Sequence, residues 1–217
     1  LSSRRIKAVS KKHDHFPKYQ SATVFMNSIS QNIPILLLGL LYSPEIAGFY
    51  ALTARILQAP ISLIGSSTRK VYYQRASKMY ANGENFFYLY LETTLGLLKL
   101  FILPLAVVFF FGEVIFSFAF GEGWVEAGHY SEILIFWFLF LFINSPSVMT
   151  FSILKLQKVQ MKLEIISIFL RFFSIYIGFY LFNSVNISIQ LFTFTSVLVN
   201  IFVIIYIYIK LKKEFLK

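Results

Sequence analysis

Six long apolar blocks dominate the sequence and restrict what the chain can fold into. Each block holds about 20 mostly apolar residues, the length at which one α-helix crosses the hydrocarbon core of a bilayer. The runs are continuous and lack the two-residue alternation of membrane β-strands. The sequence therefore predicts an all-α, polytopic membrane protein, a six-transmembrane-helix bundle with spans at about 21–41, 46–66, 93–112, 130–152, 163–182 and 188–209.

The composition agrees with this fold class. Charged residues make up 14% of the 217 residues, whereas soluble domains contain about 25%. The absence of cysteine excludes disulfides and thiolate metal sites. From the polar, basic start of the chain we expect no cleavable signal peptide, and from the first residue, Leu1, a piece of a longer chain.

The positive charges predict the orientation. Of the 20 Lys and Arg residues, 17 lie in the two termini and in two of the five connections, while the other three connections carry Glu45, Glu113, Glu122 and Glu126. The positive-inside rule places the Lys- and Arg-rich segments, and hence both termini, in the cytoplasm. We expect a basic cytoplasmic segment at 1–20, a transmembrane lobe at 21–209 and a basic tail at 210–217. The net charge of +10 is then a topology signal, and no nucleic-acid partner is predicted.

The second span is expected to continue as a helix over 69–82. Its apolar residues recur every three or four positions opposite Arg69, Lys70, Arg75 and Lys78. This pattern favours a helix on the cytoplasmic membrane surface. A solvated helix that only ends the span is the alternative.

Five ionisable residues fall within the predicted spans. Glu132 and Glu164 lie within a turn of a span end and can reach the headgroups, and Lys99 is close enough to a span end to snorkel. Arg55 and Arg171 lie near the middle of the membrane, about 12 Å from the nearer span end at about 1.5 Å per residue. Such charges are kept out of lipid and usually have a role.

Polar side chains extend these positions into stripes on several helices. Stripes of this kind either line a watery cavity or bind helices together by hydrogen bonds. We expect helix contacts for Thr193, Ser196 and Asn200, and for Arg171 an ion pair with an acid of a neighbouring helix is an equal alternative. The candidates for a substrate-binding cavity are Arg55, Gln58, Ser62, Asn27, Gln31, Arg171 and Lys99.

Four spans contain a proline, namely Pro34, Pro60, Pro104 and Pro146. Proline removes a backbone hydrogen bond and tends to kink a helix. Kinked helices near the midplane recur in transporters that alternate between two open states.

The sequence contains no pattern of an enzyme site. No Ser/His/Asp set, phosphate loop or paired-histidine motif is present, so no catalytic residue, cofactor or metal is predicted. His13 and His15 flank Asp14 in the basic start, a weak metal-like pattern that we interpret as solvated charge. His129 stands alone beside a predicted helix end.

Several strings resemble a known family. They are FPKY at 16–19, SQNIP at 30–34 after Asn27, GFYALTARIL at 48–57, PISLIG at 60–65, QRA at 74–76 and FGEGWVEAGHY at 120–130. Together these strings resemble the carboxy-terminal half of bacterial polysaccharide biosynthesis proteins of the O-antigen flippase type. That family belongs to the superfamily that includes multidrug extrusion proteins and the lipid II flippase. The similarity covers about residues 15–175.

The resemblance implies one lobe of a two-lobe transporter in the bacterial cytoplasmic membrane. Its partners would be the lipid bilayer, a missing N-terminal six-helix lobe and an undecaprenyl-pyrophosphate-linked oligosaccharide. Substrate would cross between the lobes by alternating access. Arg55 matches a commonly basic family position, where a guanidinium suits a pyrophosphate.

Three other functions stay open. A multidrug extrusion transporter would need an acidic cavity, for which only Glu132 and Glu164 are available. A polysaccharide polymerase or ligase would need a large external loop, and the longest external connection, 113–129, is too short. A purely structural bundle is the last alternative.

Overall fold

The structure is a computed structural model that describes residues 15–215, with side chains from residue 25 onward. Residues 1–14 of the predicted basic segment, with His13, and residues 216–217 of the predicted tail lie outside this range. The described residues form only helices and short links. The helices are α2 (His15–Leu41), α3 (Pro44–Ala81), α4 (Phe87–Phe120), η1 (Glu122–Trp124), α5 (Val125–Ile143), α6 (Ser145–Ile153), α7 (Gln157–Phe182) and α8 (Val185–Phe215).

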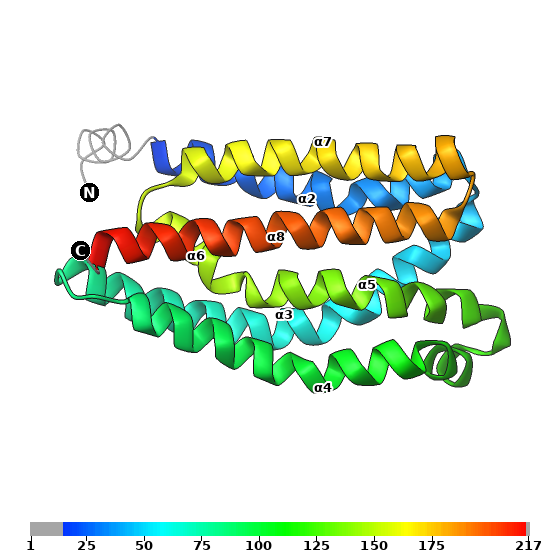
Figure 1. Cartoon of the computed structure of the whole chain (residues 1–217), viewed down its shortest axis with the longest axis horizontal. Coiled ribbons are helices and arrows are strands. Elements are labelled where there is room, and N and C mark those ends of the chain that lie inside the picture. Colours follow the sequence, from blue (N-terminus) through cyan, green and yellow to red (C-terminus); the bar gives the residue numbers. More distant parts are fainter. Residues whose placement is uncertain (1–14, 216–217) are drawn as a thin grey trace, which may run out of the picture.

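The helices lie side by side along one long axis, and their links alternate between the two ends of the bundle (Figure 1). The α3–α4 and α6–α7 links lie at the end where α8 finishes. We call this the basic end, because it carries Lys78, Lys155 and Lys213. The other end, which carries Glu45 and Glu122, is called the acidic end.

Five elements are long and apolar enough to cross a membrane: α3, α4, the Glu122–Ile153 stretch, α7 and α8. The sixth, α2, contributes a shorter apolar helix, Phe25–Leu41. The all-helical, multi-span prediction is therefore confirmed, and the six predicted spans correspond to these five elements and α2. Several helices exceed their predicted span. The 38 residues of α3 extend for about 57 Å, well beyond a hydrocarbon core of about 30 Å.

Helix α5 forms the centre of the bundle. Eleven of its 19 residues are buried, against six of the 34 residues of α4. The buried side chains include Trp137, Phe138 and Phe142, which pack in a core cluster with residues of α2, α3, α4, α7 and α8. The exposed side chains of α4 are largely Phe, Leu, Ile and Val, as expected of a surface that faces lipid.

The predicted continuation of the second span is present, because α3 runs without interruption to Ala81. Two residues of its apolar side do not face a membrane surface, however. Tyr72 and Ala76 are 2% and 0% exposed and pack in a second core cluster with Tyr90 of α4 and Ile207 of α8. The Tyr72 hydroxyl also hydrogen-bonds the hydroxyl of Thr150 in α6 (2.7 Å). The extension is thus part of the folded bundle.

The fourth predicted span is divided in two. Helix α5 ends at Ile143, and α6 starts at Ser145 with Pro146 in its first turn. Proline suits that position because the first turn of a helix needs no N–H donor from it. Pro146 therefore begins a helix, whereas Pro34, Pro60 and Pro104 lie inside α2, α3 and α4.

Two close helix contacts near the acidic end depend on glycine. A Cβ atom added to Gly128 in α5 would lie 2.5 Å from the Glu113 Cα and 2.7 Å from the Gly112 carbonyl oxygen of α4. Gly178 of α7 makes a similar approach to Ser188 of α8.

The short turn predicted between the last two spans is present, and Asn183 adopts the left-handed conformation there (φ 45°). Asparagine tolerates this conformation better than most residues.

The glycine contact leads to a packing prediction. We expect Gly128→Ala to destabilise the protein by about 1–3 kcal/mol, because the new methyl group meets backbone atoms that cannot rotate away. The loss should appear as a lower thermal unfolding midpoint in detergent. Gly96→Ala is the matched control, since a Cβ atom there meets nothing within 4 Å. The control should be neutral or stabilising by up to about 1 kcal/mol. Equal midpoints for Gly128→Ala and the unmodified chain would contradict the packing account.

Candidate functional site

A polar cavity of about 450 Å³ lies inside the helical bundle. It is bounded by residues of α2, α3, α5, α6, α7 and α8, together with Asn144 at the α5–α6 break. Its volume falls in the range of small-molecule sites, about 300–1,000 Å³. Its polar lining consists of Asn27, Gln31, Gln58, Arg69, Asn144, Ser145, Gln160, Glu164, Ser167, Arg171 and Asn200. A cavity with this lining is suited to water or to a polar ligand.

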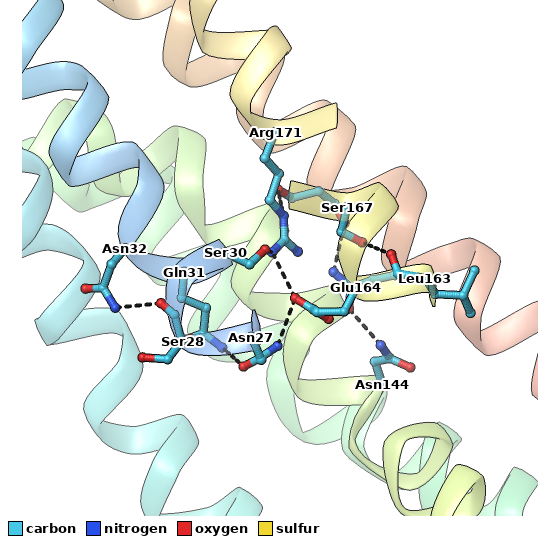
Figure 2. A network of polar contacts seen from close by, with 12 residues as sticks. Asn27, Ser28, Ser30, Gln31, Asn32, Asn144, Leu163, Glu164, Ser167 and Arg171 are labelled. Carbon is cyan, nitrogen blue, oxygen red and sulfur yellow. Dashed lines mark hydrogen bonds and ion pairs between the residues drawn. The ribbon is translucent and has the colours of Figure 1, made fainter. Parts of the chain in front are cut away.

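Arg171 is the buried charge of this cavity, with 5% of its surface exposed. Its Nε donates a hydrogen bond to the hydroxyl of Ser196 in α8 (3.1 Å), and Nη1 donates to the hydroxyl of Ser30 in α2. The guanidinium also lies 5.7 Å from the centre of the Trp137 ring of α5. A guanidinium has five N–H donors and no acceptor, so burial requires such partners. Arg171 thereby joins α7 to α5 and α8 and, as Figure 2 shows for Ser30, to α2.

The charge of Arg171 is balanced by Glu164. Arg171 Nη1 lies 4.0 Å from Glu164 Oε1, and both residues belong to α7. The same Glu164 oxygen accepts a hydrogen bond from Asn27 of α2 (3.3 Å), and Asn27 in turn accepts one from Gln31 (2.7 Å). Figure 2 shows these side chains converging from α2 and α7. The network is therefore close to neutral, with Asn27 and Gln31 extending it along α2.

The break between α5 and α6 contributes Asn144 to the cavity. Its Nδ2 donates to Asn200 Oδ1 of α8 (2.8 Å), and Asn200 Nδ2 donates to the carbonyl of Ser196 (2.8 Å). The Asn144 Oδ1 atom is buried and has no hydrogen-bond partner among the described residues. Since a buried acceptor without a partner is costly, a water or a ligand in the cavity would stabilise this atom.

The cavity brings together four of the seven predicted site residues. Asn27, Gln31, Gln58 and Arg171 line it. The other three are exposed and do not line it: Arg55 and Ser62 on α3, and Lys99 on α4. The Ser62 hydroxyl donates to the Ala59 carbonyl of its own helix (2.8 Å).

Glu164 lines the cavity from α7, which begins at Gln157, six residues before the predicted span. The partner of Arg171 therefore comes from its own helix and not from a neighbouring one. The spacing of Glu164, Ser167 and Arg171 on one face of α7 was the available signal. Asn144, Gln160 and Arg69 were not among the predicted site residues.

The expected helix contacts are present for two of three residues. Ser196 and Asn200 bond across helices, to Arg171 and Asn144. Thr193 is buried, and its hydroxyl has no partner among the described residues.

The ion pair leads to a stability prediction. Glu164→Gln leaves the buried guanidinium without its counter-charge, which we expect to cost about 3–5 kcal/mol. Combining it with Arg171→Gln removes the unbalanced charge, so the double variant should be more stable than Glu164→Gln alone. Thermal unfolding midpoints in detergent measure this, with the exposed Glu122→Gln as control. Additive losses in the double variant would show that the two charges do not interact.

Comparison with known proteins identifies the family of the chain. Residues 5–129 match the family model for polysaccharide biosynthesis proteins. No curated protein and no solved structure matches the chain. The family match includes α2, α3 and α4, and thus Asn27, Gln31, Arg55, Gln58, Ser62 and Lys99, while Glu164 and Arg171 lie beyond it. Because the match extends over more than half of the 217 residues, the chain belongs to the polysaccharide biosynthesis protein family.

Proposed function

We propose that this chain is one lobe of a membrane transporter, a flippase, that moves a lipid-linked oligosaccharide across the membrane. The observation that carries the proposal is the polar cavity of about 450 Å³ within a bundle of membrane-length helices. The resemblance to O-antigen flippases implies a substrate whose sugars are attached to a lipid carrier. A cavity with polar side chains in an apolar bundle suits contact with the sugar, while the lipid stays in the hydrocarbon.

The position of Arg55 supports an anionic substrate. Arg55 lies 11 residues after the start of α3, about 16 Å along the helix at about 1.5 Å per residue. It is exposed, and no described residue forms an ion pair or hydrogen bond with it. A charge at this depth cannot face hydrocarbon without a cost of several kcal/mol. Arg55 is therefore proposed to face a water-filled path between two lobes.

The surroundings of Arg171, inside the cavity, and of Arg55, outside it, favour different roles for the two arginines. Arg171 is balanced by Glu164 and hydrogen-bonded on several sides, so its main role is structural. Arg55 retains its N–H donors for a ligand. A planar guanidinium binds phosphate oxygens through two parallel hydrogen bonds, and Arg55 is thus the proposed contact for the pyrophosphate of the lipid carrier.

A second candidate function rests on Glu164. An acid in a cavity is what a multidrug extrusion transporter needs to bind cationic compounds, and Glu164 is half-buried in this one. Here the acid lies 4.0 Å from Arg171 and accepts a hydrogen bond from Asn27, so its charge is already satisfied. The oligosaccharide flippase is for that reason the preferred proposal.

The membrane proposed for the chain is the bacterial cytoplasmic membrane, with the basic end inside. The basic end carries the Lys- and Arg-rich links, and positively charged links stay in the cytoplasm.

Orientation can be tested with reporter fusions. Fusions after Lys78, Lys158 and Lys217 should report cytoplasm, and fusions at Glu45, Gly123 and Ser184 should report the exterior. A well-expressed fusion that reports the opposite side would refute the orientation.

The role of Arg55 can be tested in cells that make the polysaccharide. We expect Arg55→Ala to abolish surface polymer while protein abundance stays normal, because a charge-assisted contact is worth about 1.5–3 kcal/mol and Arg55 supports no described contact. Arg55→Lys should restore only part of the activity, since an ammonium lacks the planar fork. The readouts are surface polysaccharide and immunoblot abundance.

The matched control is Arg75→Ala, an exposed arginine of the same helix beyond the predicted span. It should leave polymer export unchanged. Normal export by Arg55→Ala at unchanged abundance would overturn the proposed contact. Loss of drug resistance with normal polymer would favour the extrusion transporter.

A further inference from the structure

Three metal-ligating side chains meet between α4 and α5 near the acidic end. They are Glu113 of α4 and His129 and Glu132 of α5, and one ligand atom of each lies within 4.8 Å of the others. His129 Nδ1 and Glu113 Oε1 are 3.1 Å apart. The side chains of His129 and Glu113 are 34% and 48% exposed, so an ion from solution can reach them. The proposed transport function does not use this cluster.

The backbone holds the three ligands on rigid elements. Gly112 and Gly128 let α4 and α5 approach until their backbones touch, and Glu113 and His129 are the next residues in each helix. His129 and Glu132 are three residues apart and so share one face of α5. The Glu113 backbone N–H also donates to Glu132 Oε1 (3.2 Å), which orients that carboxylate and leaves its second oxygen for a ligand. Ordered metal sites depend on outer contacts of this kind.

The donor set fits a transition-metal dication. One imidazole nitrogen and two carboxylate oxygens are common ligands of Zn²⁺, at about 2.0–2.2 Å, and two ligands of one tetrahedral ion then stand about 3.4 Å apart. The 3.1 Å between His129 Nδ1 and Glu113 Oε1 is a hydrogen bond, which a bound ion would replace with only a small separation of the two atoms. The imidazole disfavours Mg²⁺ and Ca²⁺, which prefer oxygen alone. The local charge also attracts a cation, because residues 100–154 contain four glutamates and no lysine or arginine.

We propose that Glu113, His129 and Glu132 form a binding site for a Zn²⁺-class divalent cation, with a coordination position left for water. The ion would link α4 to α5 at the acidic end, beside their glycine contact. Binding would stabilise the folded lobe, since the ligands come together only when the two helices are packed.

The test uses the purified full chain in detergent, stripped of metal with a chelator. Titration with Co²⁺, followed by its visible absorption, and with Zn²⁺, followed by calorimetry, should show one site. His129→Ala should weaken binding at least about tenfold, and Glu132→Gln should weaken it as well. Zn²⁺ should raise the unfolding midpoint of the unmodified chain but not of His129→Ala. A thousandfold excess of Mg²⁺ should not displace the ion.

The chain offers a sharp control, because it has only three histidines and the other two are His13 and His15. The double variant His13→Ala/His15→Ala should keep the site, and so should Glu126→Gln, an acid of α5 outside the cluster. Binding that disappears in the double variant, or that is equal in His129→Ala and the unmodified chain, would overturn the proposal. If His129→Ala elutes as an aggregate, metal binding is measured for Glu132→Gln and His129→Gln instead. Unchanged binding in both of these variants would also overturn the proposal.

Discussion

Hydrocarbon offers no hydrogen-bond partner, so every polar group that enters a bilayer has to find one within the protein. Arg171 shows how far this requirement shapes the bundle. Its guanidinium is bonded to Ser196 of α8 and Ser30 of α2, lies beside Trp137 of α5 and faces Glu164 of its own helix. Four helices thus take their mutual positions partly from one buried cation. The apolar packing around α5 completes the arrangement but would not by itself select it.

The cavity and the helix break have a common origin. A continuous helix through residues 125–153 would pair its backbone groups along its whole length. At Asn144 the chain instead changes from α5 to α6, and the Asn144 side chain bonds Asn200 while its own oxygen stays unpaired. Irregular helix geometry at membrane depth is tolerated where it is enclosed by protein or borders a cavity. The α5–α6 break is enclosed by protein and also borders the cavity, so the buried α5 can end at this depth.

Block length and charge predicted the helices well, because a membrane span is a local property of about 20 residues. The site could not be predicted in the same way, because it depends on contacts between side chains. Arg171 stood out as a charge among apolar residues, but its pairing with Glu164 of the same helix was not predicted, because spacing along a helix does not show which acid a side chain turns toward. Asn144 gave no signal, since Pro146 fits a kinked span as well as a new helix. Tyr72 and Ala76 are buried by helices far away in the sequence, which a helical pattern in 69–82 does not reveal.

The pairing of Glu164 with Arg171 within a single helix bears on how the protein is made. During synthesis each segment leaves the translocon for the lipid before later segments exist. An isolated arginine at that stage costs about 2.5–3.5 kcal/mol at the helix centre. Because both charges lie on one face of α7, two turns apart, they can neutralise each other as soon as that helix forms. Residues 157–182 therefore carry their own counter-ion into the membrane, and the hydrogen bonds to α2 and α8 can follow during assembly.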